Sequence, residues 1–327
     1  MPYQTGYGRQ VSVVIAVVGP TATGKSRLAV ELALAVAGEV VNADAFAVYR
    51  GMDIGTAKTS AADQRGVTHH LVDVVDPDAQ VSVAQYRQAG RTVLDDLAAR
   101  GKRAVVVGGS GLYVRALLDP MHFPGTDPEL RDALEARVEH EGAAALHTEL
   151  AAVAPEAARA IDPRNVRRVV RALEVYILTG RPPTTDLPRY TYEIPALQIG
   201  LELPRDVLDA AIDARVEAMW AAGFVEEVRR LRSAGMSRTA RTAVGYAQVL
   251  AMLDGVTDEP TARTQTVTAT RRLARKQMGW FGRDPRICWL PAHAPDLLDQ
   301  ALALVQDSGD GSYVLPGQGS IRSDHPI

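Results

Sequence analysis

A phosphate-binding loop lies near the start of the chain, where residues 19–26 read GPTATGKS. The octapeptide fits the pattern G-x-x-x-x-G-K-[ST], in which backbone N–H groups surround a phosphate, the lysine reaches the outer phosphates and the last hydroxyl binds Mg²⁺. An apolar, β-branched run precedes it at residues 11–18, and good helix formers follow at residues 27–37. This context puts a helix N-terminus at the anion. We therefore expect a phosphorylated ligand to be held by Gly19, Pro20, Thr21, Ala22, Thr23, Gly24, Lys25 and Ser26.

A single acidic residue, Asp44, ends the second expected strand, in the sequence EVVNAD. A carboxylate at the carboxyl end of a core strand points into the crevice where the phosphate loop lies. There it can act as a general base, or bind Mg²⁺ with Ser26, directly or through water. The alternative is an aspartate that only caps the next turn.

The turn after the strand expected at residues 103–107 lacks a carboxylate. The strand runs into Gly108-Gly109-Ser110-Gly111, whereas P-loop nucleotidases commonly place an acid there to help hold Mg²⁺. An ordinary ATPase or kinase is therefore disfavoured. The glycines instead predict a tight turn that brings backbone and the Ser110 hydroxyl close to a ligand.

Four arginines recur at helical spacing and share one face of an expected helix: Arg164, Arg167, Arg168 and Arg171. The opposite face is apolar, with Val166, Val169, Val170, Leu173 and Ile177. Because like charges stacked in this way destabilise an isolated helix, an unpaired stripe indicates contact with a polyanion. A solvated face with remote acidic partners is the alternative. A second basic cluster lies at residues 271–276, where part of it also favours the helix dipole.

The sequence also predicts the strands and helices that position these candidate residues. Strands are expected at residues 11–18, 39–43, 70–75, 103–107 and 196–203. Helices are expected at residues 27–37, 83–100, 112–118, 205–222, 226–233 and 261–281. The alternation predicts an α/β fold, a P-loop core whose mostly parallel sheet is flanked by helices and binds ligands at the carboxyl ends of its strands. Between residues 127 and 180 the pattern is helical and alanine-rich, which predicts an all-helical insertion domain.

The chain is expected to divide into four segments. Residues 1–125 form the first part of the core and residues 126–190 form the helical insertion. Residues 191–307 return to the core and add C-terminal helices, and residues 308–327 form a flexible tail. The proline-bearing stretch at residues 181–192 marks the return.

The composition is that of an ordinary globular protein. The 327 residues are 46% apolar and 23% charged, and they carry a net charge of −3. No apolar run approaches the roughly 20 residues that span a bilayer, and the N-terminus has no signal-peptide core. The one cysteine, Cys288, fits a reducing compartment. We therefore expect a cytoplasmic monomer that does not bind membranes.

On these residues, the chain resembles the bacterial tRNA dimethylallyltransferases, the tRNA isopentenyltransferase or IPP transferase family, over residues 11–290. The motifs that carry the resemblance, in chain order, are GPTATGKS, NADAFAVYRGMDIGTAK, HHLVD, GGSGLY, NVRRVVRALEVY, AVGYAQ and TRRLARKQMGWF. The segment GMDIGTAK is much more specific than the phosphate loop.

The resemblance implies an activity: transfer of a dimethylallyl group from dimethylallyl diphosphate to N6 of the adenosine at tRNA position 37, beside the anticodon. The tRNAs concerned read codons that begin with U. It also implies Mg²⁺ as cofactor and an insertion that grips the anticodon stem-loop.

The resemblance also assigns residues. Asp44 matches the catalytic base, Arg215 joins the phosphate loop in holding the diphosphate, and Ser110 stands where the family usually has threonine. The matching tRNA-contact positions are Asp44, Ala45, Phe46, Ala47, Ser110, Arg131, Asn165, Val166, Arg167, Arg168, Val169, Arg171, Arg241, Thr242, Ala243, Val244, Gly245, Tyr246, Arg275, Lys276 and Gln277.

One position departs from the family pattern. Ala45 replaces the serine that often follows the catalytic aspartate, which puts one hydroxyl contact to RNA in doubt. Three alternative functions remain: a P-loop kinase that uses ATP, a prenyltransferase that acts on free adenine nucleotides, and a non-catalytic RNA-binding protein. The extended arginine surfaces argue against a mononucleotide acceptor, and the phosphate loop with Asp44 argues against a non-catalytic role.

Overall fold

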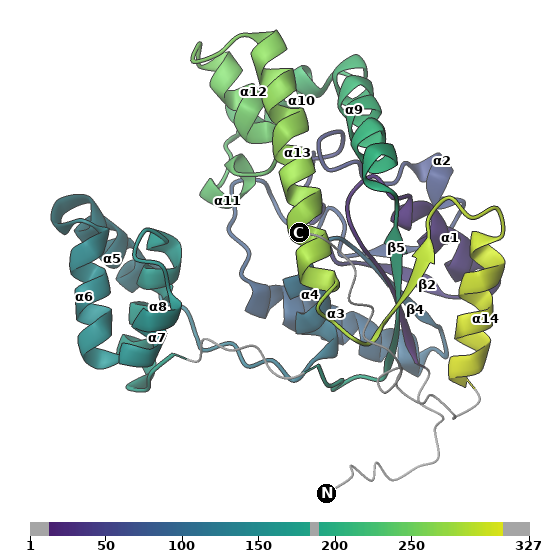
Figure 1. Ribbon diagram of the computed structural model, residues 1–327, viewed down its shortest axis with the longest axis horizontal. Coiled ribbons are helices and arrows are strands. Elements are labelled where there is room, and N and C mark those ends of the chain that lie inside the picture. Colours follow the sequence, from purple (N-terminus) through teal and green to yellow (C-terminus); the bar gives the residue numbers. More distant parts are fainter. Residues whose placement is uncertain (1–12, 184–189, 310–327) are drawn as a thin grey trace, which may run out of the picture. The chain divides into compact units, whose positions relative to one another are not determined.

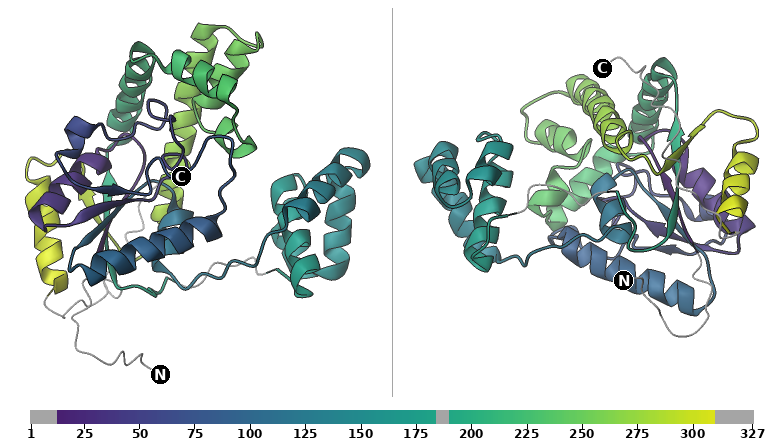
Figure 2. Two further views of the ribbon diagram at one scale, coloured as in Figure 1. Left: turned by 180° about the vertical axis from the view of Figure 1, so that it is seen from behind. Right: turned by 60° about the horizontal axis from the view of Figure 1, so that its bottom comes forward.

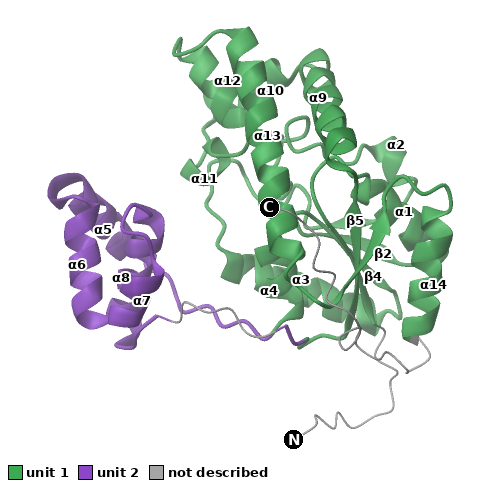
Figure 3. Ribbon diagram, viewed as in Figure 1, with its two compact units in different colours: residues 1–119, 192–327 green, residues 120–191 purple. Residues whose placement is uncertain are grey.

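The computed structural model describes residues 13–183 and 190–309. The chain forms two compact units (Figure 3). Unit 1 comprises Met1–Asp119 and Tyr192–Ile327, and unit 2 comprises Pro120–Thr191. Unit 2 is thus an insertion within the sequence of unit 1. Among the described residues, no helix combines the length and the apolar character that a membrane span requires.

Within the described part of unit 1, six strands form one sheet in the order β3-β2-β4-β1-β5-β6 (Figure 1). Every pairing between neighbouring strands is parallel. The strands are β1 (Val14–Val18), β2 (Glu39–Asn42), β3 (His69–His70), β4 (Ala104–Val107), β5 (Ala196–Glu202) and β6 (Ile287–Pro291). The expected α/β fold with a mostly parallel sheet is confirmed.

Successive side chains of the central strands enter opposite cores, because a strand alternates its faces with a period of two. Ile15 and Val17 of β1 pack with α1 (Lys25–Ala35) and α14 (Leu297–Gly309). Ala16 and Val18 lie in the other core, with α3 (Val83–Ala99) and α4 (Gly111–Leu118). Figure 2 shows the sheet between these two helix layers. Both faces are therefore buried, which explains why its strands are continuous apolar runs.

A cluster of further helices stands beyond the carboxyl end of β5 (Figure 1). Its members are α9 (Arg205–Ala221), α10 (Phe224–Ala234), α11 (Arg238–Arg241), α12 (Tyr246–Leu253) and α13 (Glu259–Phe281). Phe224 and Tyr246 are fully buried here and pack edge-to-face, with ring centroids 5.0 Å apart. A short helix, α2 (Ala61–Gln64), precedes β3.

The described residues of unit 2 form four helices with a core of their own. They are α5 (Pro128–Glu141), α6 (Ala143–Val153), α7 (Pro155–Ala160) and α8 (Val166–Thr179). Leu134, Leu146, Leu150 and Leu173 form the centre of this core. Asp127 caps α5 before a proline, and Gly180 ends α8 in a left-handed conformation, both common boundary signals.

Several expected boundaries are wrong. The strand expected at residues 70–75 stops at His70, because Leu71 and Asp73 adopt left-handed conformations with φ of 60° and 55°. The sequence did not indicate β6, α11, α12 or α14. Since α14 continues to Gly309, the expected tail does not begin at residue 308. The rest of that tail, residues 310–327, lies outside the described residues, as do residues 11 and 12 of the first expected strand.

Candidate active site

The phosphate loop joins β1 to α1 and depends on glycine at two points. Gly19 has φ of 129°, and a Cβ there would lie 2.5 Å from the Leu201 carbonyl oxygen on β5. Gly24, with φ of 80°, is the N-cap of α1. The Thr23 hydroxyl donates to the Pro20 carbonyl at 2.9 Å and closes the loop on itself. The backbone N–H groups at the start of α1 are therefore placed where they can bind an anion.

Two cations face this loop. Lys25 donates through Nζ to the Pro20 carbonyl. Burial, reinforced by the charge of Arg215 and opposed by Asp44, lowers the pKa of Lys25 to about 7. Burial also lowers the pKa of Arg215, which α9 supplies, and Asp44 opposes this shift. Both cations are poorly solvated without an anion, as expected at a site that binds one.

Asp44 follows β2 and is held by a local turn. Its Oδ1 accepts hydrogen bonds from the backbone N–H groups of Phe46 at 2.8 Å and Ala47 at 3.2 Å. Its own N–H donates to Oδ1 of Asn42 at 3.0 Å, and Asn42 Nδ2 donates to the Leu71 carbonyl at 3.0 Å. Oδ2 of Asp44 makes no hydrogen bond within the described part of the chain. One carboxylate oxygen thus fixes the turn and the other remains available for chemistry.

The glycine-rich turn after β4 packs closely on its surroundings. A Cβ on Gly108 would lie 2.2 Å from the Ala43 carbonyl oxygen, and one on Gly111 would lie 1.9 Å from the Trp280 ring. Ser110 Oγ accepts a hydrogen bond from the Ala45 N–H at 3.3 Å. The Ser110 hydroxyl therefore contacts the loop beside Asp44 and does not line the cavity described next.

A cavity of about 320 Å³ brings these groups together. The phosphate-loop residues Thr21, Ala22, Gly24, Lys25 and Ser26 line it, together with Asp44 and Arg215. Its volume lies at the low end of the range of roughly 300–1,000 Å³ for small-molecule sites. The anion-binding loop, two cations and a carboxylate therefore line one half-open cavity.

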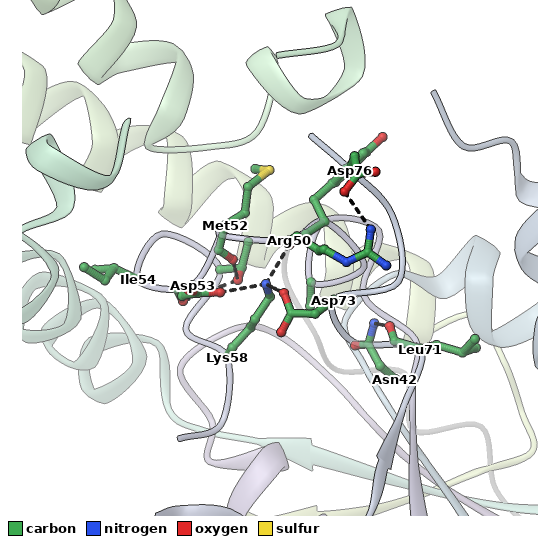
Figure 4. A network of polar contacts seen from close by, with 12 residues as sticks. Asn42, Arg50, Met52, Asp53, Ile54, Lys58, Leu71, Asp73 and Asp76 are labelled. Carbon is green, nitrogen blue, oxygen red and sulfur yellow. Dashed lines mark hydrogen bonds and ion pairs between the residues drawn. The ribbon is translucent and has the colours of Figure 1, made fainter. Parts of the chain in front are cut away.

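The segment GMDIGTAK forms another wall of the cavity, through Gly55, Thr56, Ala57 and Lys58. Lys58 fixes this segment from within (Figure 4). Its side chain is 7% exposed and donates to the Tyr49 carbonyl at 2.6 Å, to Asp53 at 2.7 Å and to Asp73 at 2.5 Å. The nearby pair Arg50–Asp76, at 2.6 Å, lies at the surface.

A buried carboxylate fixes the same segment from the other side. Glu227 of α10 is 1% exposed and accepts from the backbone N–H groups of Asp53 at 3.1 Å, Ile54 at 2.8 Å and Gly55 at 3.3 Å. It also accepts from the Tyr246 hydroxyl at 2.6 Å. The sequence pattern missed Glu227. The sequence singled out the GMDIGTAK segment but did not indicate which residue contacts it.

The expected RNA-contact residues of unit 1 fall into two groups. Thr242, Ala243, Val244 and Tyr246 line the cavity, and Gly245, with φ of 89°, lies between them. Tyr246 is fully buried, and burial beside Glu227 raises the pKa of its hydroxyl. Arg241, Arg275 and Lys276 are instead exposed at the surface. Gln277 is 8% exposed, lines the same cavity and accepts a hydrogen bond from the Thr21 N–H of the phosphate loop.

In unit 2, the expectation of four unpaired arginines is wrong for two of them. Arg164 lies before α8 and pairs with Asp162 at 2.8 Å. Arg171 pairs at 2.7 Å with Glu174, a buried carboxylate on the next helical turn, and also donates to two backbone carbonyls. Within the described residues, Arg167 and Arg168 make no ion pair and are exposed.

The other unit 2 candidates have structural contacts. Arg131 also pairs with Glu174, at 2.6 Å. Asn165 caps α8 by accepting from the Arg168 N–H at 3.3 Å. Val169 is fully buried and Val166 is half-buried at the edge of the same core. Any RNA contact by Val169 is therefore limited to its backbone.

The donors available for a metal ion are few. Among residues 13–183 and 190–309, no group of three or more histidine, cysteine, aspartate or glutamate side chains could hold one. The Ser26 hydroxyl, exposed in the first turn of α1, and the Asp44 carboxylate both line the cavity. This sparse donor set fits Mg²⁺, which keeps several waters and binds one or two carboxylates plus substrate phosphates.

Comparison with known proteins identifies the family. Residues 47–284 match the family model for IPP transferase. The tRNA dimethylallyltransferase of Bifidobacterium longum is 53% identical over 305 residues, which cover 92% of this chain and 93% of that protein. The enzyme of the same name from Thermobifida fusca is 53% identical over 307 residues, 92% of this chain and 96% of that one. The crystal structure of tRNA isopentenylpyrophosphate transferase from Bacillus halodurans superimposes with a TM-score of 0.68 at 34% identity, covering 91% of this chain and 98% of that one. The chain therefore belongs to the IPP transferase family, together with the tRNA dimethylallyltransferases of these bacteria.

Proposed function

We propose that this protein transfers the dimethylallyl group of dimethylallyl diphosphate to N6 of adenosine 37 in tRNAs that read codons beginning with U. The products are N6-(dimethylallyl)adenosine and diphosphate. The observation that carries the proposal is the single cavity that joins the phosphate loop, Lys25 and Arg215 to the Asp44 carboxylate. Anion-binding groups and a carboxylate in one cavity suit a reaction that expels a diphosphate and removes a proton from the nucleophile.

Catalysis depends mainly on stabilising the leaving group. The bond between the allylic carbon and the diphosphate oxygen breaks, and the electron pair stays on the diphosphate. Lys25, Arg215 and the N–H groups at the start of α1 stabilise that charge in a site with little water, where such interactions are strongest. The poor solvation of both cations before binding favours the anion further.

Asp44 completes the reaction as the general base. A C–N bond forms between the allylic carbon and N6 of adenine, and the N6 proton passes to Oδ2 of Asp44. Its Oδ1 stays engaged with Phe46 and Ala47, so the carboxylate keeps its orientation. A positioned base of this kind contributes roughly 10²–10⁴-fold to the rate.

We infer that Mg²⁺ binds with the diphosphate. Ser26 and Asp44 would hold it, directly or through water, because both line the cavity and supply the last hydroxyl of the phosphate loop and a carboxylate. When bound, the ion neutralises charge on the diphosphate.

RNA binding is proposed for the exposed basic residues of both units. Arg167 and Arg168 on α8, with Arg241, Arg275 and Lys276 in unit 1, are exposed and suited to phosphate contacts. Adenosine 37 must leave the anticodon-loop stack to reach Asp44, which is inexpensive in a single-stranded loop. We propose that such a base packs against Thr242, Ala243 and Val244, which line the cavity.

The test offers total tRNA, AMP and ATP side by side as acceptors of labelled dimethylallyl diphosphate. Label should enter tRNA, and nuclease digestion should recover it as N6-(dimethylallyl)adenosine. Label in AMP or ATP but not in tRNA would contradict the proposal and favour a nucleotide prenyltransferase. A reaction that requires ATP would favour the kinase alternative.

A further inference from the structure

Gln277 joins two loops of the proposed active site. It lies on α13 and is 8% exposed. Its Oε1 accepts a hydrogen bond from the Thr21 N–H, in the phosphate loop, at 2.8 Å. Its Nε2 donates to the Gly109 carbonyl, in the turn after β4, at 3.0 Å. These partners precede Gln277 by 256 and 168 residues in the sequence.

Only one orientation of this amide satisfies both partners. If the amide were reversed, its NH₂ group would face the Thr21 N–H and its oxygen would face the Gly109 carbonyl. Both half-buried backbone groups would then lose their hydrogen bonds to Gln277. The approach is also close: a Cβ on Gly109 would lie 2.2 Å from Gln277 Nε2. The side chain therefore fixes both loops at a defined separation.

The same helix face continues this interaction toward Asp44. Trp280, about one turn after Gln277, fills the space above Gly111. Between the two glycines, Ser110 accepts a hydrogen bond from the Ala45 N–H, next to Asp44. A continuous set of contacts thus runs from the phosphate loop through Gln277 and the glycine turn to the loop that carries the carboxylate.

We propose that Gln277 is a positioning residue that sets the placement of the phosphate loop relative to Asp44, and that its side chain does not contact RNA. The inference deepens the proposed function and rests on the donor site assigned there. The leaving group and the base must lie on opposite sides of one reacting carbon–nitrogen pair. A misplacement of about 1 Å between such groups lowers a rate by roughly 10²-fold.

Two variants test this role. Gln277→Met keeps the length of the side chain but removes both hydrogen bonds. Gln277→Glu keeps the acceptor for Thr21 but places a carboxylate against the Gly109 carbonyl; once protonated, the acid can donate to that carbonyl. Thr266→Val is the matched control, because Thr266 is 1% exposed on the same helix, does not line the cavity and donates its hydroxyl to the Ala262 carbonyl one turn earlier.

The measurements are the single-turnover transfer rate with both substrates saturating, the affinity for tRNA with its salt dependence, and the affinity for inorganic diphosphate. For Gln277→Met we expect the rate to fall at least about tenfold and diphosphate to bind at least about threefold more weakly. Affinity for tRNA and its salt slope should match the wild-type protein. For Gln277→Glu, the rate relative to wild type should recover as the pH falls from about 8 to about 6, because burial raises the pKa of the new carboxyl group. Thr266→Val should retain the wild-type rate.

The opposite results would overturn the inference. A weaker tRNA affinity with a reduced salt slope in Gln277→Met would make Gln277 an RNA-binding residue. A lower melting temperature with unchanged rate and diphosphate affinity per folded molecule would leave it only a packing role. If the wild-type protein transfers no label to tRNA, the proposed function is rejected. The role of Gln277 is then tested by comparing the diphosphate affinities of wild type and Gln277→Met. Equal diphosphate affinities of wild type and Gln277→Met would then reject it.

Discussion

Asp44 uses its two carboxylate oxygens differently. Oδ1 accepts from two backbone N–H groups, as a capping aspartate does, while Oδ2 has no hydrogen bond within the described residues. The two sequence interpretations of Asp44, a turn cap and a reactive carboxylate, are therefore compatible. The bracing of its backbone by Asn42 could not be predicted, because it depends on the distant Leu71 carbonyl.

Lys25 should make donor binding depend on pH. Its pKa is about 7, mainly because burial disfavours its charge. A bound diphosphate favours the charged form and raises that pKa, so binding above about pH 7 takes up a proton. We expect the affinity for dimethylallyl diphosphate to fall by up to about tenfold per pH unit above about pH 7.

Calorimetric titrations in two buffers of different ionisation enthalpy measure both the affinity and the proton uptake. Lys25→Arg is the control, since a guanidinium stays charged throughout this range, and its binding should not depend on pH. A wild-type affinity that is constant from about pH 7 to about pH 9, without proton uptake, would contradict the assignment of Lys25.

At the scale of elements, local patterns predicted the central strands and the phosphate loop, because each is encoded by neighbouring residues. The strand expected at residues 70–75 was predicted too long, because left-handed residues at 71 and 73 interrupt the apolar run after β3. The contacts of Gln277 and Glu227 with their loops were missed because those loops lie more than a hundred residues away in the sequence. Such pairings are a product of the tertiary fold.

The interaction between α10 and the GMDIGTAK segment should be essential to the site. Glu227→Gln places an NH₂ group among four donors, so at least one of them is left without an acceptor. We expect stability to fall by about 1–3 kcal/mol and the transfer rate to fall as well, because the segment lines the cavity. Denaturant unfolding and transfer assays measure these effects. Glu226→Gln is the control, since Glu226 is exposed and pairs with Arg229 at the surface; equal effects of the two variants would reject the anchoring role.

Helix α8 should bind RNA through Arg167 and Arg168, because Arg171 is committed to the buried Glu174. We expect Arg167→Ala with Arg168→Ala to weaken tRNA binding and to reduce its salt slope by roughly one for each phosphate that is no longer neutralised. Binding titrations at several salt concentrations measure both effects. Arg159→Ala, which removes an exposed charge from α7, should change neither. An unchanged salt slope of tRNA binding in the double variant would show that these arginines are only solvated and do not contact RNA phosphates.

At the scale of the whole molecule, the chain leaves unit 1 after Asp119 and returns at Tyr192. Both residues contact one buried guanidinium: Arg286 pairs with Asp119 at 2.7 Å and lies over the Tyr192 ring at 4.1 Å. Arg286 also pairs with Asp284 at 2.7 Å, and Arg115 pairs with Asp119 at 2.6 Å. The two ends of the insertion are thus fixed to the same ion cluster within unit 1.

Breaking this cluster should destabilise unit 1. Arg286→Met leaves Asp284 as a buried carboxylate without its guanidinium partner, and removing one partner of a buried pair costs about 3–5 kcal/mol. For a unit of this size, that corresponds to a melting temperature lower by roughly 10 °C. Thermal unfolding measures the change, and Arg283→Met, in the same turn but exposed, is the control. Equal melting temperatures would show that the cluster does not stabilise the fold.

The central claim is that Asp44 is the base in a prenyl transfer whose leaving group lies in the phosphate loop. The most direct test is a single-turnover assay of Asp44→Asn, which keeps the acceptor for Phe46 and Ala47 but removes the charge. We predict a rate of label transfer to tRNA that is lower by roughly 10²-fold or more, with tRNA affinity within a few-fold of wild type. In the absence of Mg²⁺, diphosphate affinity should be equal or higher, since a negative charge has been removed beside Lys25 and Arg215. A near-normal transfer rate in this variant would contradict the account.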